Sequence, residues 1–543
     1  MASPTRPVRV YRWRSRLPAL LAISVVMTVV MTACGGGAST GSSAAALEEQ
    51  TWLVPQDWGA IDPTKTTATN TGTILLALEP LVLADGKGGV LPNLAAQTTP
   101  NPTTYVYSVR PGVKFSDGTL LTMDDVLYSF EIHTKKGSDS ALAGDFSGVT
   151  SIVRTGQNQL TITLSRPNIE FPNYVAQVGI VEKSVREKQG STPGSPGHLN
   201  VGTGPYTVTD YQPGNQVVLA RNESYWGTKP TAKKITLRLI QDDSARLLAV
   251  QSGSVTGAFE IPAAQVPVYS RADGMTVIKG PNPSTTMLSF NTTRAPWNDI
   301  HVRRAVTMAI DKAGIVNAVL SGNGIPAASI VQRTVIEKLM PAADADALYA
   351  QLDPYPHDPA AAKVELARSA TPTGFTGQLV YSQAEPSSGL VAQAVAQQLA
   401  PLGINLTVSS LPDSQYTDEV FFKHTAPPAI VDFTTDIPDP ISLPNYLSNS
   451  VNTLAKGGYT DIGEYSNPAQ DQLLDQYLRL TTDQTTERAS LLSRALRNLA
   501  ADQPYVPIYN ANYLAVVKKG LTFENFDGMW WMQRWPNLVA AAT

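Results

Sequence analysis

Cysteine is nearly absent from this sequence of 543 residues, because Cys34 is the only one. No disulfide can therefore form within the chain, although exported proteins often carry them. The histidines are few and lack the spacing of metal ligands: they are His133, His198, His301, His357 and His424. We accordingly expect no transition-metal site built from thiolates and imidazoles.

Common catalytic and nucleotide-binding motifs are also missing. The sequence contains no Walker A loop with its lysine and Ser/Thr and no His-Glu-x-x-His zinc helix, and its Gly-x-Ser-x-Gly match, at residues 37–41, follows Cys34 in a run of small residues and not a predicted strand, so it is no serine elbow. We therefore expect a protein without catalytic residues or a cofactor.

The first residues form a basic and then apolar segment that is too short to cross a membrane. An uncharged apolar run extends from Leu17 to Met31, whereas a spanning helix needs roughly 20 such residues. Arginines precede this run, and small residues rather than a charged stop-transfer flank follow it. The arginines are Arg6, Arg9, Arg12, Arg14 and Arg16. This pattern is typical of a secretory signal, and we predict a signal peptide at residues 1–33.

Cys34 lies where the signal ends, and the segment around it resembles a bacterial lipobox. The resemblance implies cleavage just before Cys34 and lipidation of its thiol, with residues 34–46 as a flexible tether. Cleavage removes five of 41 basic residues and none of the 45 acidic ones, which gives the mature chain a net charge of −9. Such a charge argues against a nucleic-acid partner.

The remaining composition, with 43% hydrophobic and 16% charged residues, is that of a globular protein, and the length suggests two or three domains. Alternation of Tyr105, Tyr107 and Val109 predicts a half-buried strand. Thr122 and Asp125 resemble a capping box that starts a helix with an apolar side.

Helical spacing recurs further along the chain. It predicts a helix over 302–310 and a second, shorter helix that Asp311 caps and Gly322 ends. Residues 377–382, 390–402 and 404–409 read as strand, helix and strand, which is a candidate βαβ unit. A late amphipathic helix with Asp483 as its cap precedes a strand over 505–509.

A series of segments in a fixed order resembles the peptide-binding family (family 5) of bacterial ABC-importer solute-binding proteins, the dipeptide- and oligopeptide-binding lipoproteins. The segments are Ile61-Asp62-Pro63, Val113 to Gly118 with Leu121, Thr122, Asp125 and Val126, Gly202 to Tyr206, Arg221-Asn222, Tyr225-Trp226-Gly227, Phe290-Asn291-Thr292, and Asp299 with Val302 to Ala305 and Ala309-Ile310-Asp311. Most of these residues have a structural explanation. Gly118, Gly204 and Gly227 suit tight turns, while Phe115, Tyr206 and Trp226 suit the core.

The resemblance implies an α/β, two-lobed periplasmic-binding-protein-like fold (type II, cluster C) with an extra small α/β domain. Lobe I would be discontinuous and consist of residues 47–85, 201–283 and 515–543. The extra domain would be residues 86–200, and lobe II residues 284–514.

The same resemblance implies a peptide site between the lobes. Phe433, Thr434, Thr435 and Asp436 match the position where an aromatic residue, two backbone-pairing residues and an aspartate face the ligand. Asp436 would accept charge-assisted hydrogen bonds from the peptide ammonium, with Asp439 as the second-choice carboxylate.

Further binding residues are expected on other segments: Thr67, Ala68 and Thr69 as a second backbone ladder, and Tyr509 and Asn510 near the hinge. A residue for the peptide carboxylate is not assigned. Arg303 and Arg304 are expected on the solvated or ion-paired face of their helix, and Arg333 lies in a stretch that departs from the family pattern.

Closure of the lobes on a short peptide is the implied mechanism, with ABC permease subunits and separate ATPase subunits as partners. The chain would be a monomer held at the extracytoplasmic face of the membrane by its lipid. One alternative keeps the fold but changes the cargo to haem, a nickel chelate or another small solute. A surface hydrolase and a purely structural lipoprotein are the alternatives from other classes.

Overall fold

The computed structural model describes residues 47–65, 68–434 and 437–542. The predicted signal peptide, Cys34 and the tether lie outside the described residues, as do Thr67, Thr435 and Asp436. None of the helices in the described part of the chain is long and apolar enough to cross a membrane.

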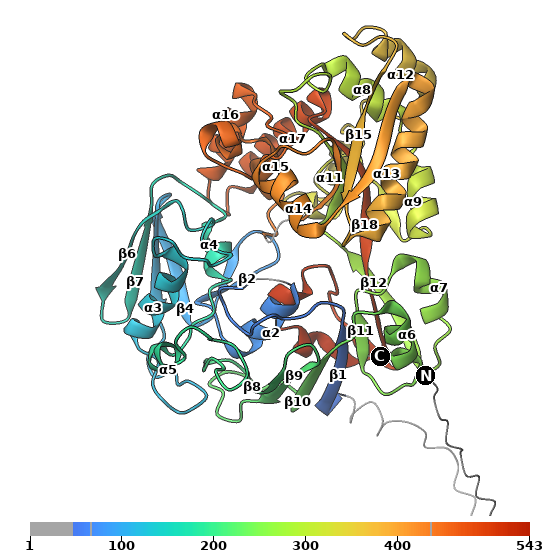
Figure 1. Ribbon diagram of the computed structural model, residues 1–543. Helices are drawn as coiled ribbons and strands as arrows, with labels where there is room; N and C mark the ends of the chain where they lie inside the picture. Colours follow the sequence, from blue (N-terminus) through green and yellow to red (C-terminus); the bar gives the residue numbers. More distant parts are fainter. Residues whose placement is uncertain (1–46, 66–67, 435–436, 543) are drawn as a thin grey trace, which may run out of the picture. The chain divides into compact units, whose positions relative to one another are not determined.

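A twelve-stranded mixed sheet is the largest element of the fold (Figure 1). Its neighbours run in the order β16-β15-β17-β13-β18-β11-β1-β10-β9-β8, and β12 and β14 also pair with β18. The bounds are β1 (Glu49–Val54), β8 (Tyr206–Gln212), β9 (Gln216–Arg221), β10 (Lys234–Leu239), β11 (Gly257–Phe259), β12 (Met275–Pro281), β13 (Thr285–Ser289), β14 (Gly324–Pro326), β15 (Phe375–Ser382), β16 (Ile404–Leu411), β17 (Ala429–Phe433) and β18 (Tyr505–Lys518).

Strand β18 runs through both lobes, so the predicted boundary at residue 514 falls within it. Its first half pairs with β13 and β14 of lobe II, and its second half pairs with β11 and β12 of lobe I. The short segment between β12 and β13 is a second crossing. The predicted strand over 505–509 is therefore correct but is only the beginning of a longer strand.

The predicted βαβ unit is confirmed. Strands β15 and β16 are parallel neighbours, and α13 (Pro386–Leu399) connects them before a left-handed Gly403 at φ 78°. The two predicted helices of lobe II are α8 (Ile300–Ala309), capped by Asp299, and α9 (Lys312–Leu320), capped by Asp311. Their apolar faces share one core with α13 and the sheet, because the buried residues recur at helical spacing.

The extra domain contains a four-stranded antiparallel sheet in the order β4-β5-β7-β6. Tyr105, Tyr107 and Val109 point into its core from β5, as the alternation predicts. The capping box of Thr122 and Asp125 is confirmed at the start of α3. The bounds are β4 (Ala95–Asn101), β5 (Thr104–Val109), β6 (Val149–Gly156), β7 (Gln159–Leu164), α3 (Met123–Thr134), α4 (Phe171–Val175) and α5 (Lys183–Lys188).

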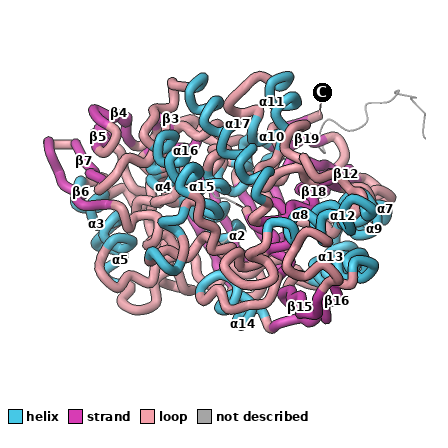
Figure 2. Tube along the Cα trace, turned by 90° about the horizontal axis from the view of Figure 1, so that it is seen from above, coloured by secondary structure: helices cyan, strands magenta, loops and turns pink. Residues whose placement is uncertain are grey.

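Smaller elements complete the described chain (Figures 1 and 2). They are the pair β2 (Val82–Ala84) and β3 (Val90–Pro92), the pair β19 (Leu521–Phe523) and β20 (Val539–Ala541), α2 (Ala68–Ala77), α6 (Asp243–Gln251), α7 (Val266–Tyr269), α10 (Arg333–Ile336), α11 (Ala342–Tyr349), α12 (Pro359–Leu366), α14 (Asp413–Thr417), α15 (Ser442–Ser448), α16 (Pro468–Leu478) and α17 (Thr485–Asp502).

Two local predictions are wrong. Asp483 does not cap α17, because Gln484 occupies the cap position and the Asp483 carboxylate accepts a hydrogen bond from Thr481. Arg303 is buried rather than solvated: its guanidinium donates to the carbonyl oxygens of Asp502 at the end of α17 and of Trp297. Carbonyls at a helix C-terminus lack intrahelical donors, and a buried guanidinium satisfies them.

The family-like motifs tie lobe I together around one buried carboxylate. Glu79 accepts hydrogen bonds from Thr203, the Tyr225 hydroxyl and the Trp226 indole at 2.7–2.9 Å, and it also pairs with Arg534. Gly118 has the positive φ of a turn, as predicted. Gly204 instead allows close approach, because a Cβ there would lie 2.4 Å from the Leu76 carbonyl oxygen.

Candidate ligand-binding site

Phe433 ends strand β17, and the segment after it holds the predicted peptide site. Its half-buried ring lies 6.0 Å from that of Phe421, against the core of lobe II. Thr434 follows with an exposed side chain. Thr435 and Asp436 are outside the described residues, so their roles stay predictions.

Asp432, one residue before Phe433, lies in a row of polar side chains across the sheet. Thr286 on β13 pairs with Asp432 on β17 and with Tyr509 on β18. Directly opposed residues in antiparallel strands share a face of the sheet. The row therefore places a carboxylate and a phenol on either side of a threonine, on the face opposite to Phe433.

Four carboxylates from both lobes gather around this row: Glu260, Glu385, Asp413 and Asp432, which we call the acidic cluster. The Asp432 side chain is exposed to solvent, although many protein atoms lie around it. This surrounding protein raises the pKa of Asp432 to about 7, and the nearby charge of Glu385 contributes. Burial likewise raises the pKa of Glu385, with Asp413 adding to the effect.

Glu260 brings lobe I into the cluster. It follows β11 in a left-handed conformation at φ 53°, and the Tyr513 hydroxyl donates to it at 3.2 Å. Burial raises the pKa of Glu260, and the charge of Glu385 in lobe II adds to this. The positive charge of Arg246 acts on Glu260 in the opposite direction, but none of the four carboxylates forms an ion pair with another described residue.

The other predicted binding residues have different positions. Tyr509 is buried beside the acidic cluster, and burial raises its pKa to about 12. The Asn510 side chain is buried and donates to Ser284 and Thr285, so it braces the two crossing strands instead of facing a ligand. Ala68 and Thr69 form the first turn of α2, which is helical and not the extended ladder we expected.

Asp439, the second-choice carboxylate, is a structural residue. It is 1% exposed and forms an ion pair with the buried Arg488 at 2.6 Å. The Tyr477 hydroxyl donates to it at 2.7 Å, and the backbone of Ile441 donates at 3.1 Å. These bonds occupy the carboxylate and leave it unsuited to bind a ligand ammonium.

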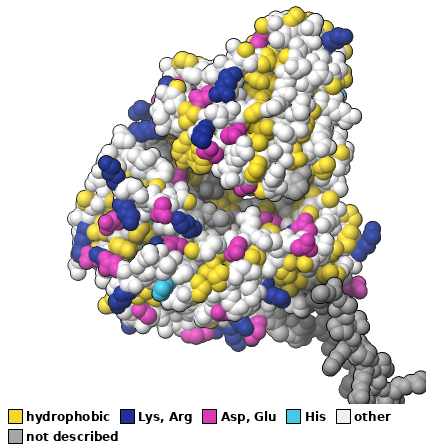
Figure 3. Space-filling model, viewed as in Figure 1, with side chains coloured by type: hydrophobic (Ala, Val, Ile, Leu, Met, Phe, Trp, Pro, Cys, Tyr) yellow, Lys and Arg dark blue, Asp and Glu magenta, His cyan; other side chains and the backbone are white. Residues whose placement is uncertain are grey.

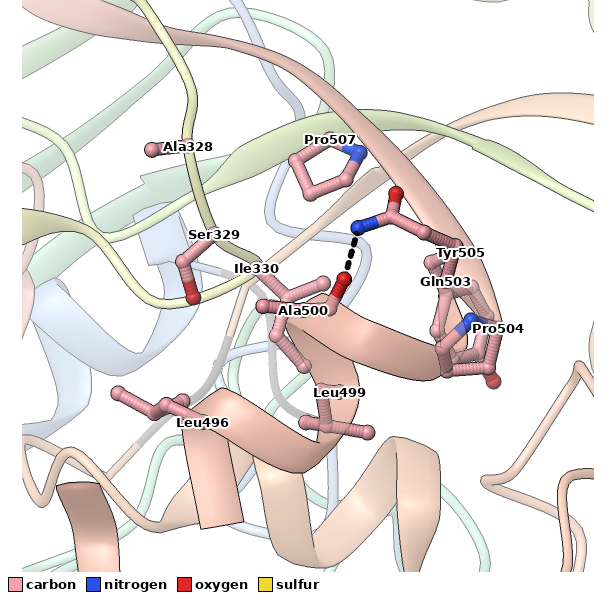
Figure 4. Close-up of a pocket in the computed structure, with 10 residues that line it drawn as sticks. All are labelled: Ala328, Ser329, Ile330, Leu496, Leu499, Ala500, Gln503, Pro504, Tyr505 and Pro507. Atoms are coloured by element: carbon pink, nitrogen blue, oxygen red, sulfur yellow. Dashed lines mark hydrogen bonds between the residues drawn. The ribbon is translucent and has the colours of Figure 1, made fainter. Parts of the chain in front are cut away.

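Arg333 is also unsuited to the ligand, because it forms ion pairs with Glu337 and Asp346 on the surface of lobe II. A small pocket nearby lies between the end of α17, the start of β18 and residues 328–330 (Figure 4). Its lining is apolar apart from Ser329, Gln503 and the Tyr505 hydroxyl, and Gln503 donates to the Ala500 carbonyl. The pocket offers no charge for a ligand terminus.

The face in Figure 3 is hollowed between lobe I and lobe II, and acidic and basic side chains are interspersed around the hollow. Within the described residues, no group of His, Cys, Asp and Glu has the arrangement of a metal site.

Sequence reasoning missed Asp432, Glu385 and Glu260. Asp432 carries a weak signal, because an acid in the apolar strand 429–433 breaks the expected pattern. Glu385 and Glu260 are far from it in sequence, and only the paired strands of the two lobes bring them near.

The fold and this arrangement define a two-lobed solute-binding protein. The model of the bacterial extracellular solute-binding proteins, family 5, matches residues 89–454, about two thirds of the chain. A probable D,D-dipeptide-binding periplasmic protein, DdpA of Escherichia coli K12, is 30% identical over 429 residues, which cover 77% of this chain and 79% of DdpA. The glutathione-binding protein GsiB of the same organism is 26% identical over 79% of this chain and 81% of GsiB.

Among solved structures, DppA of Helicobacter pylori in complex with the peptide STSA superposes with a TM-score of 0.75 at 20% identity, covering 91% of this chain and 98% of DppA. This protein belongs to family 5 of the bacterial extracellular solute-binding proteins. The family confirms the expected two-lobed α/β fold and a binding protein rather than an enzyme.

Proposed function

We propose that this protein captures short peptides with a free amino terminus between its lobes and delivers them to an ABC importer. Its partners are permease subunits and separate ATPase subunits. The names of DdpA and of the STSA-bound DppA support a peptide cargo.

The observation that carries this proposal is the acidic cluster, whose carboxylates come from both lobes and form no ion pair among the described residues. Carboxylates that are partly desolvated and repel one another favour a positive group placed between them. A peptide ammonium is such a group. Bringing it in relieves the repulsion only when both lobes surround it, so the ligand shifts the population toward the closed protein.

In this mechanism Asp436 accepts the hydrogen bonds of the ammonium, and the acidic cluster supplies a negative potential around it. Phe433, Thr434 and Thr435 present backbone and an aromatic edge to the extended peptide, and Thr67 contributes from lobe I. Tyr509 forms the base of the site beside Asp432. Backbone pairing is indifferent to side chains, so many peptide sequences fit.

Calorimetry with tri-alanine and N-acetyl-tri-alanine tests the proposal. Asp436→Ala should weaken tri-alanine binding by about 2–5 kcal/mol, because a buried charge partner is lost. The acetylated peptide should bind weakly to both proteins. Asp418→Asn, at an exposed pair with Lys423, serves as the matched control and should bind like wild type. Equal losses for both peptides would remove Asp436 from the site.

We further propose that Cys34 is lipidated after cleavage of residues 1–33, which holds the protein at the extracytoplasmic face of the membrane as a monomer. Cys34→Ala should move the protein from the membrane fraction to the soluble fraction. A native mass spectrum of the mature protein from its host should show both the lipid mass and the retained cargo.

A further inference from the structure

A short segment of the extra domain, residues 168–174, touches lobe II. The backbone N–H of Ile169 donates to the Leu478 carbonyl at 3.1 Å, and the hydroxyls of Tyr174 and Tyr446 lie 3.2 Å apart. Glu170 accepts a hydrogen bond from the Asn445 amide at 3.0 Å and contacts the Ser442 hydroxyl. This contact, which we call the clasp, joins two parts of the chain that are about 270 residues apart.

Each side of the clasp inserts one isoleucine side chain into the hydrophobic core of the other side. Ile169 of the extra domain packs in the core of lobe II, and Ile437 of lobe II packs in the core of the extra domain. Both side chains are at most 5% exposed. Separating the two parts would expose both side chains to water, so burial of apolar surface stabilises the clasp.

The clasp and the chain crossings lie on different sides of the protein. Figures 1 and 2 place α4 beside α15 and α16, away from β12 and β18, where the chain crosses between the lobes. The extra domain is itself fixed to lobe I, because Arg186 pairs with Asp62 at 2.9 Å and Ile180 donates to Glu79. A rotation of the lobes about the crossing strands must therefore break the clasp.

Glu170 is the ionisable group at the centre of the clasp, and it is fully buried. Asp439 of lobe II, paired with Arg488, and Asp145 of the extra domain are the charged groups around it. Tyr174 and Tyr446 complete its ionisable surroundings. No cation pairs with Glu170 among the described residues, so the contact favours a neutral, protonated carboxyl.

A protonated Glu170 fits the hydrogen bonds at this position. The Ser442 hydroxyl donates to one of its oxygens and the Asn445 amide to the other, and because a hydroxyl can also accept, a protonated carboxyl can donate to Ser442 in turn. Burial, and then the charge of Asp439, raise the pKa of Glu170 to about 8. In an opened protein the carboxyl would meet water, where an ordinary glutamate titrates near pH 4.3.

We propose that the extra domain is a proton-dependent clasp, in which Glu170 takes up one proton when the domain closes onto the ligand-bearing loop of lobe II. The part of this loop that the extra domain holds is residues 437–441, because Ile437 lies in the core of the extra domain and Ser442 begins the next helix. A carbon at Gly88 would lie 2.8 Å from Asp439, and Asn173 donates to the Gly88 carbonyl, so the extra domain holds this loop at a second point. This proposal depends on the proposed function in one respect only: the clasp would restrain the loop that carries the proposed ammonium site.

The clasp is tested without a ligand, by electron spin resonance distances between nitroxide labels at Gln157→Cys and Gln472→Cys. Both residues are exposed, one on the extra domain and one on lobe II. The full chain with Cys34→Ala carries no other thiol. A carboxyl with a pKa of about 8 in the closed form and about 4.3 in the open form predicts that the closing equilibrium constant falls about 90-fold from pH 6 to pH 9. The short-distance population should fall accordingly.

Glu170→Gln copies the protonated carboxyl, because its amide can donate to Ser442 and its oxygen can accept from Asn445. We expect this variant to keep the short distance at both pH values. Glu187→Gln, at an exposed carboxylate of the extra domain, should keep the wild-type response. A wild-type population that is unchanged between pH 6 and pH 9, or a Glu170→Gln variant that still opens at pH 9, would overturn the proposal. No peptide is present, so failure here is independent of whether peptides are the cargo.

Discussion

Asp439→Asn is expected to damage the fold and not the ligand site, although Asp439 lies three residues from the predicted ammonium partner. The carboxylate and Arg488 are both at most 2% exposed. The amide that this substitution introduces has two possible orientations. Its NH₂ group points either toward the guanidinium or toward the Tyr477 hydroxyl and the Ile441 N–H. Each orientation sets donor against donor and leaves Arg488 buried without a counter-charge.

Breaking a buried pair by removing one partner costs about 3–5 kcal/mol. If lobe II unfolds as a unit of about 230 residues, its unfolding entropy is about 0.5 kcal/mol/K, and the loss corresponds to a fall in Tm of about 6–10 °C. Thermal unfolding followed by circular dichroism measures this shift. Asp418→Asn, which breaks an exposed pair worth about 0–1 kcal/mol, is the control.

A second variant separates charge from packing. Arg488→Met together with Asp439→Asn removes the unpaired cation, so the double variant should be more stable than Asp439→Asn alone. Asp436→Ala should leave Tm unchanged and act on peptide binding instead. The reasoning fails if Asp439→Asn melts with the control, or if it binds tri-alanine as poorly as Asp436→Ala while remaining fully stable.

The other predictions concern lobe I and pH. Gly204→Ala should destabilise the protein by about 1–3 kcal/mol, because its Cβ would lie 2.4 Å from the Leu76 carbonyl oxygen, while Gly148→Ala, with only one contact at 3.9 Å, should change Tm little. Tri-alanine affinity should rise from pH 5.5 to pH 7, since a cation favours ionised Asp432, whose pKa is about 7, and calorimetry of Asp432→Asn should show this rise abolished.

The sequence predicted most of the local structure, because local signals determine it. The capping box at Thr122, the cap at Asp311 and the βαβ unit over 375–411 are confirmed. Asp483 was misread as a helix cap, since several polar residues in a row can each take that position. Arg303 was misread because a helical pattern does not reveal that the end of another helix covers it.

The candidate site was less predictable, because its parts come from distant segments. Family resemblance pointed to the loop after Phe433 and kept Asp439 as its second-choice carboxylate, because nothing local shows that Arg488 neutralises Asp439 from 49 residues away. Ile169 and Ile437 show the same limit. Their apolar character predicts burial, but nothing local indicates that each lies in the core of the other part.

A change in pH affects the ammonium site and the clasp in opposite directions. The ammonium site weakens as pH falls through the pKa of Asp432, because a neutral carboxyl attracts a cation less. The clasp weakens as pH rises through the pKa of Glu170, because ionisation then opposes burial. Peptide affinity should therefore pass through a maximum between about pH 7 and pH 8. Each limb has its own residue: Asp432→Asn should flatten the acid limb alone, and Glu170→Gln should make the alkaline limb alone less steep, leaving the fall caused by deprotonation of the peptide amino group at about pH 8. A single variant that flattened both limbs would mean that one group, and not two, governs capture.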